Sequence, residues 1–288
     1  MSWWDDAVHR AVAEALLAGA LGAIVGVRVV VRRLSFFTMA LTHATFPGVV
    51  AAALLGINVM IGGVVAGTVV TLGVVALGRR AGQGATAATG VLLSAGFALG
   101  AALVATRNGF GKDLSALLTG SVLAVGDGDL IATGVVLALV AAVLLVFGRQ
   151  LTFSGFDPAG ARSAGLAVPS WDLLLLLTVQ VTVVAMVPAV GTFLAVALIV
   201  APAAAARLWS DRIPVITALA VLFGTTSGLA GLYASARWNV AAGAAITLAA
   251  ASVLPLSMLL SWCSRSVPGR GLARVATGPG DVRTENGS

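Results

Sequence analysis

Long apolar stretches follow one another along almost the whole chain, and the short segments between them carry most of the charged residues. A helix needs about 20 apolar residues to cross a bilayer. The stretches that reach about this length are Val12–Val31, Leu34–Gly78, Ala81–Thr106, Leu130–Gly148, Leu173–Leu208, Ile213–Ala236 and Trp238–Ser264. This pattern predicts an all-α, polytopic integral membrane protein.

Two of these stretches are long enough for two passes each. Leu34–Gly78 contains a turn signal at Gly56-Ile57-Asn58, and Leu173–Leu208 is interrupted at Pro188 and Gly191. We therefore predict nine passes, or eight if the seventh pass, which follows Gly191, is short or partly re-entrant.

Two connections are predicted to hold short helices. Leu114–Val125 is apolar but too short to cross a bilayer, so we expect it to pack in the protein interior. In the loop Gly148–Ser170, Asp157 is suited to cap a helix that has Pro158 at its first position, and Gly165 is suited to end it. This second helix is either an ordinary connector or a docking helix for a soluble partner.

The composition agrees with a membrane location. Hydrophobic residues make up 59% of the chain and charged residues 10%, whereas soluble domains carry about 25% charged residues. The mean hydropathy is +1.04. We expect a single transmembrane domain over residues 1–264 and a flexible polar tail over residues 265–288. The single cysteine, Cys263, excludes an intrachain disulfide and a zinc site built from several cysteines.

The net charge of +6 is interpreted as an orientation signal and not as a sign of nucleic-acid binding, because basic residues gather in cytoplasmic loops. If the loop after the first span is cytoplasmic, most of the 17 basic residues face the cytoplasm. These are Arg28, Arg32, Arg33, Arg79, Arg80, Arg149, Arg162, Arg207, Arg212, Arg265, Arg270, Arg274 and Arg283. The bias predicts an N-terminus outside and a C-terminus in the cytoplasm.

His43 stands out among the few polar residues of the predicted spans. Met39 lies four residues before it, so the two side chains share a face of a helix. Neutral imidazole is the commonest biological metal ligand, and intramembrane polar groups are usually functional. The alternative is a structural histidine that bonds a backbone carbonyl or a neighbouring threonine, such as Thr42 or Thr45. Both interpretations remain open at this point.

No Asp, Glu, Lys or Arg is expected at mid-membrane depth. Transporters driven by protons or sodium usually need such a group for coupling. The pattern therefore disfavours a secondary transporter and favours a pore whose energy comes from elsewhere. An intramembrane enzyme is disfavoured as well, because His9 and His43 are the only histidines and no acid lies beside them in a catalytic arrangement.

Four segments resemble the permease subunits of the zinc and manganese ABC importers, the ABC-3 family. They are RRLSFFTMALTHATFPGVV at Arg32–Val50, GSVLAVGDGDL at Gly120–Leu130, FDPAGARSAGL at Phe156–Leu166 and VGTFLAVALIVAPAAAARL at Val190–Leu208. The first is similar to the family's Asp-Ala-Leu-Ser-His-Ala-x-x-Pro-Gly pattern. The order and spacing agree from the first span to about Leu260.

The resemblance implies an ABC importer permease of the metal and cobalamin type. It implies a homodimer in membrane lipid, two cytoplasmic ATPase subunits that hydrolyse ATP, and an extracytoplasmic metal-binding protein, in the cytoplasmic (inner) membrane of a bacterium. The permease itself would have no catalytic residue and no cofactor besides the transported divalent metal ion. The loop helix would be the coupling helix that contacts the ATPase, through Asp157, Pro158, Ala161, Arg162, Gly165 and Leu166.

The resemblance also carries His43 over as a transient metal ligand on the transport path. The family's acid four residues before this histidine is replaced by Met39. A thioether is a softer ligand than a carboxylate, so this departure favours zinc over manganese and leaves copper open. The alternatives are an ABC permease for a metal chelate such as a siderophore or haem, and a secondary transporter without an ATPase.

Overall fold

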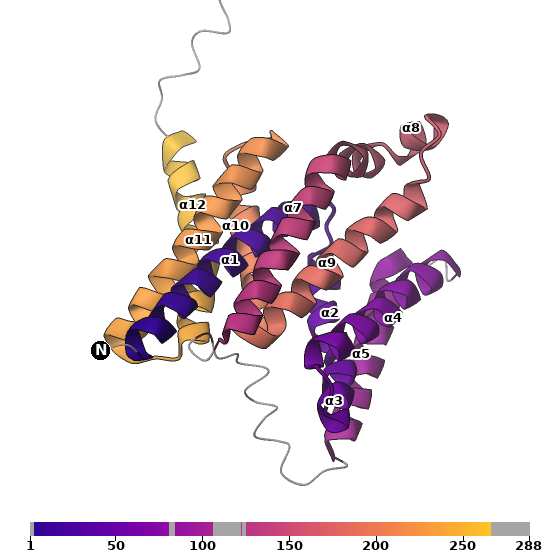
Figure 1. Ribbon diagram of the computed structural model, residues 1–288. Coiled ribbons are helices and arrows are strands. Elements are labelled where there is room, and N and C mark those ends of the chain that lie inside the picture. The colour runs from indigo at the N-terminus through magenta and orange to yellow at the C-terminus, as the bar shows by residue number, and fades with distance from the viewer. Residues whose placement is uncertain (1–2, 81–83, 106–121, 123–124, 266–288) are drawn as a thin grey trace, which may run out of the picture.

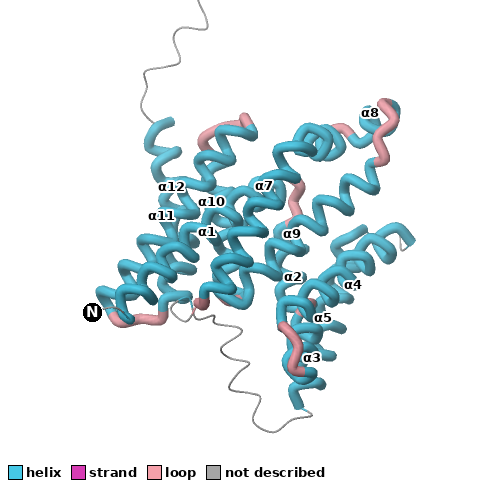
Figure 2. Tube along the Cα trace, in the orientation of Figure 1, coloured by secondary structure: helices cyan, strands magenta, loops and turns pink. Residues whose placement is uncertain are grey.

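The computed structural model describes residues 3–80, 84–105, 122 and 125–265, and in these ranges it contains helices and no strand (Figures 1 and 2). The helices are α1 (Trp3–Val31), α2 (Ser35–Ala44), α3 (Phe46–Leu55), α4 (Val59–Arg80), α5 (Gly84–Ala105), α7 (Asp127–Phe156), α8 (Pro158–Ser163), α9 (Val168–Val190), α10 (Thr192–Arg207), α11 (Ile213–Trp238) and α12 (Ala242–Arg265). The predicted short helix Leu114–Val125 lies outside the described residues, apart from residues 122 and 125.

Eight helical segments in the described ranges are long and apolar enough to cross a membrane, with α2 and α3 together forming the one from Ser35 to Leu55. Helix α10 is a shorter apolar helix that follows Gly191. The prediction of eight or nine passes is therefore confirmed, and α10 is the short element expected after Gly191.

The first span begins earlier than the sequence predicted. Helix α1 starts at Trp3, and its candidate span starts at Ala7 and not at Val12. The helix continues through the charged residues at its start because backbone hydrogen bonding does not depend on an apolar side chain. Glu14, two residues after the predicted start at Val12, therefore lies about two turns inside the span.

Helix α1 runs through the middle of one half of the molecule, where it packs against α7, α10 and α11 (Figure 1). Glycines allow the closest of these approaches. A Cβ atom on Gly19 would stand 2.8 Å from the carbonyl oxygen of Gly224 on α11, closer than real Cβ atoms come. Small residues of this kind are the usual means by which membrane helices approach each other.

The other half contains α2 to α5, which join the first half where α2 and α4 pack against α9 (Figure 1). Two breaks in the helices shape this junction. Helix α2 ends at Ala44, and α3 begins at Phe46 with Pro47 in its first turn. Helices α9 and α10 separate at Gly191, whose φ of +85° is readily adopted only by glycine.

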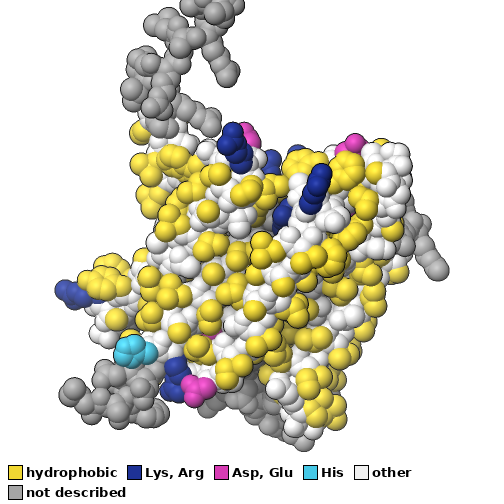
Figure 3. Space-filling view, turned by 45° about the horizontal axis from the view of Figure 1, so that its top comes forward, with side chains coloured by type: hydrophobic (Ala, Val, Ile, Leu, Met, Phe, Trp, Pro, Cys, Tyr) yellow, Lys and Arg dark blue, Asp and Glu magenta, His cyan; other side chains and the backbone are white. Residues whose placement is uncertain are grey.

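Charged side chains gather near the ends of the helices, while the area between them is mostly apolar (Figure 3). Helix α8, the connection between α10 and α11, and the last turns of α12 lie at one end of the molecule. The N-terminus and the connection between α11 and α12 lie at the other end (Figures 1 and 2).

Candidate functional site

The two predicted metal ligands lie one turn apart on α2, on a face that is only partly covered. The side chain of Met39 is 49% exposed, and His43 is half-buried. The imidazole stands edge-on to the ring of Phe97 on α5, with the ring centroids 6.2 Å apart. Aromatic pairs favour this T-shaped arrangement, so Phe97 helps to orient the imidazole of His43.

The threonines beside His43 use their hydroxyl groups within their own helix. Thr42 donates to the carbonyl of Met39 at 2.7 Å, and Thr45 donates to the carbonyl of Leu41 at 2.9 Å. Within the described residues, His43 makes no hydrogen bond through its imidazole. The arrangement therefore does not supply the threonine or carbonyl partner that a purely structural histidine would need.

One chain by itself presents a sparse set of donor atoms. Among the described residues there is no group of three or more His, Cys, Asp and Glu side chains that could hold a metal ion. His43 and Met39 together offer one ring nitrogen and one thioether sulfur. Such a pair can bind a soft or borderline metal weakly, and a complete site needs further ligands.

The predicted loop helix is present as α8, and it stands beyond the ends of α7 and α9 (Figure 1). The Asp157 carboxylate accepts a hydrogen bond from the backbone N–H of Gly160 at 2.8 Å, as expected for a cap. Gly165 has a φ of +81° and closes the helix after Ser163, and the N–H of Leu166 donates back to the carbonyl of Ala161 at 2.9 Å. The local prediction is therefore confirmed.

The surface of α8 divides into an anchored side and a free side. Ala161 is fully buried, whereas Asp157, Pro158 and Arg162 are exposed. Arg162 folds back onto its own helix, donating from Nε to the carbonyl of Pro158 at 3.1 Å. The exposed side is thus available to a partner outside the membrane.

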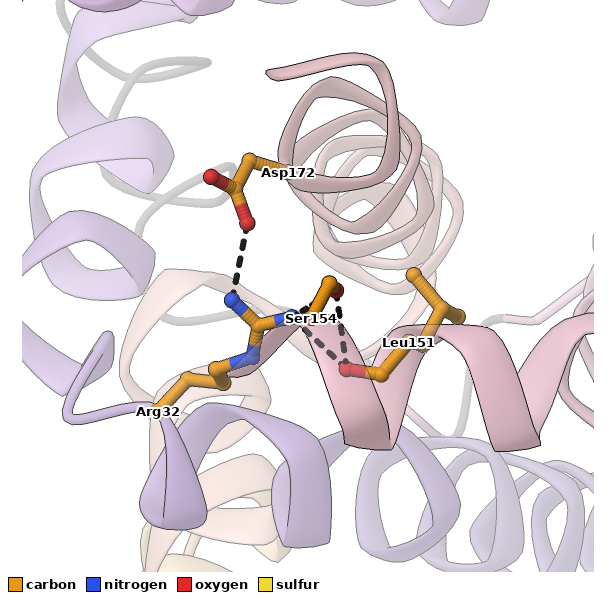
Figure 4. Close-up of polar contacts among 4 residues, drawn as sticks. All are labelled: Arg32, Leu151, Ser154 and Asp172. Carbon is orange, nitrogen blue, oxygen red and sulfur yellow. Dashed lines mark hydrogen bonds and ion pairs between the residues drawn. The ribbon is translucent and has the colours of Figure 1, made fainter. Parts of the chain in front are cut away.

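Polar connections between helices were not predicted from the sequence, and two of them lie within or beside α1. The hydroxyl of Thr133 on α7 donates to Glu14 on α1 at 2.9 Å, in a fully buried position. Arg32, just after α1, bonds groups on both α7 and α9 (Figure 4). The only sequence signal was a charged residue in or beside a predicted span, and it could not identify the partners, which are more than 100 residues away along the chain.

A model of the ABC 3 transport family matches residues 5–261. The chain belongs to the ABC 3 transport family. The manganese transport system membrane protein MntC of Halalkalibacterium halodurans is 35% identical over 254 residues, which cover 88% of this chain and 87% of that protein. The zinc transport system membrane protein TroC of Treponema pallidum is 31% identical over 89% of each chain.

A solved structure gives the same result at the level of the fold. The structure described as PsaBC from Streptococcus pneumoniae in complex with Fab matches with a TM-score of 0.79 at 30% identity, over 88% of this chain and 91% of that one. Membership in the ABC 3 transport family confirms the resemblance and the predicted fold class. The chain is a multi-pass membrane permease of an ABC transporter.

Proposed function

We propose that this chain is the membrane-spanning subunit of an ATP-driven importer of a divalent transition metal, with zinc as the preferred ion and manganese second. The observation that carries the proposal is the placement of Met39 and His43 on one partly exposed face of α2, inside the candidate span Ser35–Leu55. Relatives in the ABC 3 transport family that are named for manganese and zinc transport support the metal class.

A permease has to bind its ion weakly, because a tight site would hold the ion and stop the flux. One imidazole and one thioether from a single chain meet this requirement. In a homodimer, a two-fold axis would bring a second copy of the same pair to a shared path and provide four donor atoms. The exposure of Met39 in the isolated chain agrees with a role at such a path or interface.

The choice of zinc rests on the chemistry of the donor atoms. Manganese prefers carboxylate and carbonyl oxygens, whereas imidazole is a good zinc ligand and a thioether suits softer ions. The described residues contain no group of three or more His, Cys, Asp and Glu side chains that could hold a metal ion. The pair of Met39 and His43 therefore favours zinc, although relatives named for manganese keep that ion as the second candidate.

The energy for transport would come from ATPase subunits that bind the exposed side of α8 in the cytoplasm. The capped start, the glycine-closed end and the fully buried Ala161 make α8 a rigid element. With α8 inside, the N-terminus lies outside and the end of α12 lies inside, in agreement with the distribution of basic residues. An extracytoplasmic metal-binding protein would deliver the ion to the opposite end of the permease.

Reconstitution into vesicles tests this function. The permease and the ATPase that co-purifies with it are placed in proteoliposomes together with its binding protein, and zinc and manganese uptake are measured with and without ATP. We expect ATP-dependent uptake of zinc in preference to manganese. Uptake of a metal chelate but of neither free ion, or zinc uptake that does not need ATP, would contradict the proposal.

A further inference from the structure

Arg32 connects three helices at the end of the molecule where α8 lies (Figure 4). Its Nη1 donates to the carboxylate of Asp172 on α9 at 2.8 Å. Its Nη2 donates to the carbonyl of Leu151 at 2.7 Å and to the hydroxyl of Ser154 at 2.8 Å, both on α7. The planar, forked guanidinium can hold several acceptors in fixed directions, which an ammonium group cannot do.

The surface of α7 is shaped to receive this side chain. A Cβ atom at Gly155 would overlap the Arg32 guanidinium, so glycine at this position allows the side chain to lie against the helix. Leu151 and Ser154 are almost fully buried, and the Arg32 side chain is only 17% exposed. Arg28 lies one turn before Arg32, on the last turn of α1, and bonds the hydroxyl of Thr152. Arg28 and Arg32 therefore both attach the end of α1 to the last turns of α7.

The hydrogen bonds of Arg32 connect the helix of the two metal ligands to the helices that flank α8. Arg32 belongs to the short connection between α1 and α2, and α2 carries Met39 and His43. Its acceptors lie on α7, which leads into α8, and on α9, which follows α8. A single side chain thus ties both helices that flank α8 to the start of the helix that carries the two metal ligands.

A cavity lies beside the hydrogen bonds of Arg32. A cavity of about 260 Å³ lies between the start of α2 and helices α4, α5 and α9. It is lined on one side by residues before and at the start of α2 and on the other by residues of α4, α5 and α9: Arg32, Arg33, Leu34, Phe36, Phe37, Val74, Thr86, Thr89, Asp172, Leu175 and Leu176. The start of α2 is therefore held both by the hydrogen bonds of Arg32 and by the packing of Phe37, which is buried in the hydrophobic core beside this cavity.

We propose that Arg32 is a positioning residue for transport, which makes α7, α8 and α9 move together with α2. When the ATPase displaces α8, the bonds from Arg32 to Asp172, Ser154 and Leu151 carry the displacement to the start of α2 and so to the metal path. The proposal rests on the proposed function, because it assumes that α8 receives the motion of the ATPase.

A merely structural role for Arg32 predicts something different. Loss of a structural bond would lower the amount of assembled transporter, but the molecules that assemble would move the same amount of zinc for each ATP. Loss of a positioning bond would leave assembly and ATP hydrolysis intact and lower the zinc moved per ATP. The ratio of zinc transported to ATP hydrolysed therefore separates the two roles.

The experiment measures this ratio in proteoliposomes that contain the full transporter. Arg32→Met retains a long side chain and removes its hydrogen bonds. Arg32→Lys retains the positive charge but loses the planar, two-pronged set of donors that the guanidinium provides. Arg33→Asn is the matched control, because Arg33 is exposed, has a φ of +57° that asparagine tolerates, and makes no side-chain bond among the described residues.

We expect the ratio to fall about tenfold in Arg32→Met and by less in Arg32→Lys, with the wild-type ratio retained in Arg33→Asn. If Arg32→Met does not assemble, the double variant Ser154→Ala and Asp172→Ala removes two of the three acceptor groups and is expected to lower the ratio in the same way. A wild-type ratio in the assembled Arg32→Met, or in that double variant, would overturn the proposal.

Changes on α8 distinguish this failure from a failure of the proposed function. If Asp157→Ala with Arg162→Glu uncouples transport while the Arg32 variants do not, α8 is the docking helix and the role of Arg32 is wrong. If the wild-type transporter itself moves no zinc with ATP, the proposed function fails whatever the Arg32 variants show.

Discussion

The hydroxyl of Thr133 on α7 donates a hydrogen bond to the carboxylate of Glu14 on α1 across 2.9 Å, and both side chains are fully buried. The second oxygen of Glu14 makes no hydrogen bond within the described residues. An acidic group in this position is costly to bury, so the bond to Thr133 contributes directly to the stability of the contact between α1 and α7.

Thr133→Val is therefore expected to destabilise the protein, because it removes the donor without changing the shape of the side chain very much. Hydrogen bonds between membrane helices contribute about 0.6 kcal/mol on average and up to about 1.7 kcal/mol, and a loss near the upper value is expected at this buried site. Glu14→Gln is the matched control, since its amide oxygen still accepts from Thr133. Thermal unfolding in detergent measures both, and an unfolding temperature for Thr133→Val equal to that of the wild type would contradict this account.

The close approach of α1 and α11 leads to a second prediction. Gly19→Ala places a Cβ atom 2.8 Å from the carbonyl oxygen of Gly224, so the two helices must separate. We expect a loss of about 1–3 kcal/mol, the usual cost of overpacking a core. Gly134→Ala is the control, because a Cβ atom there meets nothing within 4 Å. Unfolding curves for the two variants should differ clearly, and equal stability would show that α1 and α11 can relax apart without cost.

Helix α8 carries a prediction about coupling. Changing Asp157→Ala together with Arg162→Glu removes the cap, which costs about 1 kcal/mol of local helix stability, and reverses an exposed charge on the proposed docking surface. The α8 segment lies outside the candidate spans, so membrane insertion and dimerisation should be retained. We expect zinc uptake in reconstituted vesicles to be lost. The control variant Ser163→Ala, on the same helix, should take up zinc at the normal rate. Unchanged zinc uptake in the double variant would show that α8 is not the docking helix.

The proposed topology predicts which sites an impermeant thiol reagent can reach. In a Cys263→Ser background, which removes the exposed natural thiol, cysteines introduced at Arg80 and Arg162 should be protected in intact cells. Cysteines at Asp6 and Asn239 should be labelled. All of these sites should react after the membrane is made permeable, and labelling of Arg162 from outside would reverse the orientation derived from the loop charges.

The sequence predicted the features that depend on neighbouring residues. Asp157, Pro158 and Gly165 define α8 because cap, first-turn proline and closing glycine act within a few residues. Gly191 marked the break between α9 and α10 for the same reason. The length of the apolar stretches was sufficient to predict the passes, since bilayer thickness sets the length of a spanning helix.

The contacts between distant parts of the chain could not be predicted in this way. Thr133 as the partner of Glu14, and Asp172 as the partner of Arg32, depend on how the helices pack, and nothing local to either residue specifies it. The start of α1 was also placed too late, at Val12, because charged residues at a helix end interrupt the apolar pattern without interrupting the helix. For the metal path, Met39 and His43 were predicted to share a face, and their placement on α2 agrees with this.

The central claim is that His43 is a transient ligand for zinc and that Met39 on the same face assists it. His43→Ala should abolish zinc uptake while expression and assembly with the ATPase are retained. Met39→Asp should shift the preference toward manganese, because a carboxylate is the harder ligand. Manganese and zinc uptake in competition would measure that shift, and an unchanged preference would exclude Met39 from the path.

The most direct test is the rate of ATP-dependent zinc uptake by His43→Gln in proteoliposomes, normalised to the amount of folded transporter. Glutamine can replace the hydrogen bonds of a structural histidine, but its amide is a poor zinc ligand beside imidazole. We predict that zinc uptake by His43→Gln is lost, as in His43→Ala. A normal rate of zinc uptake in His43→Gln would contradict the assignment of His43 as a metal ligand.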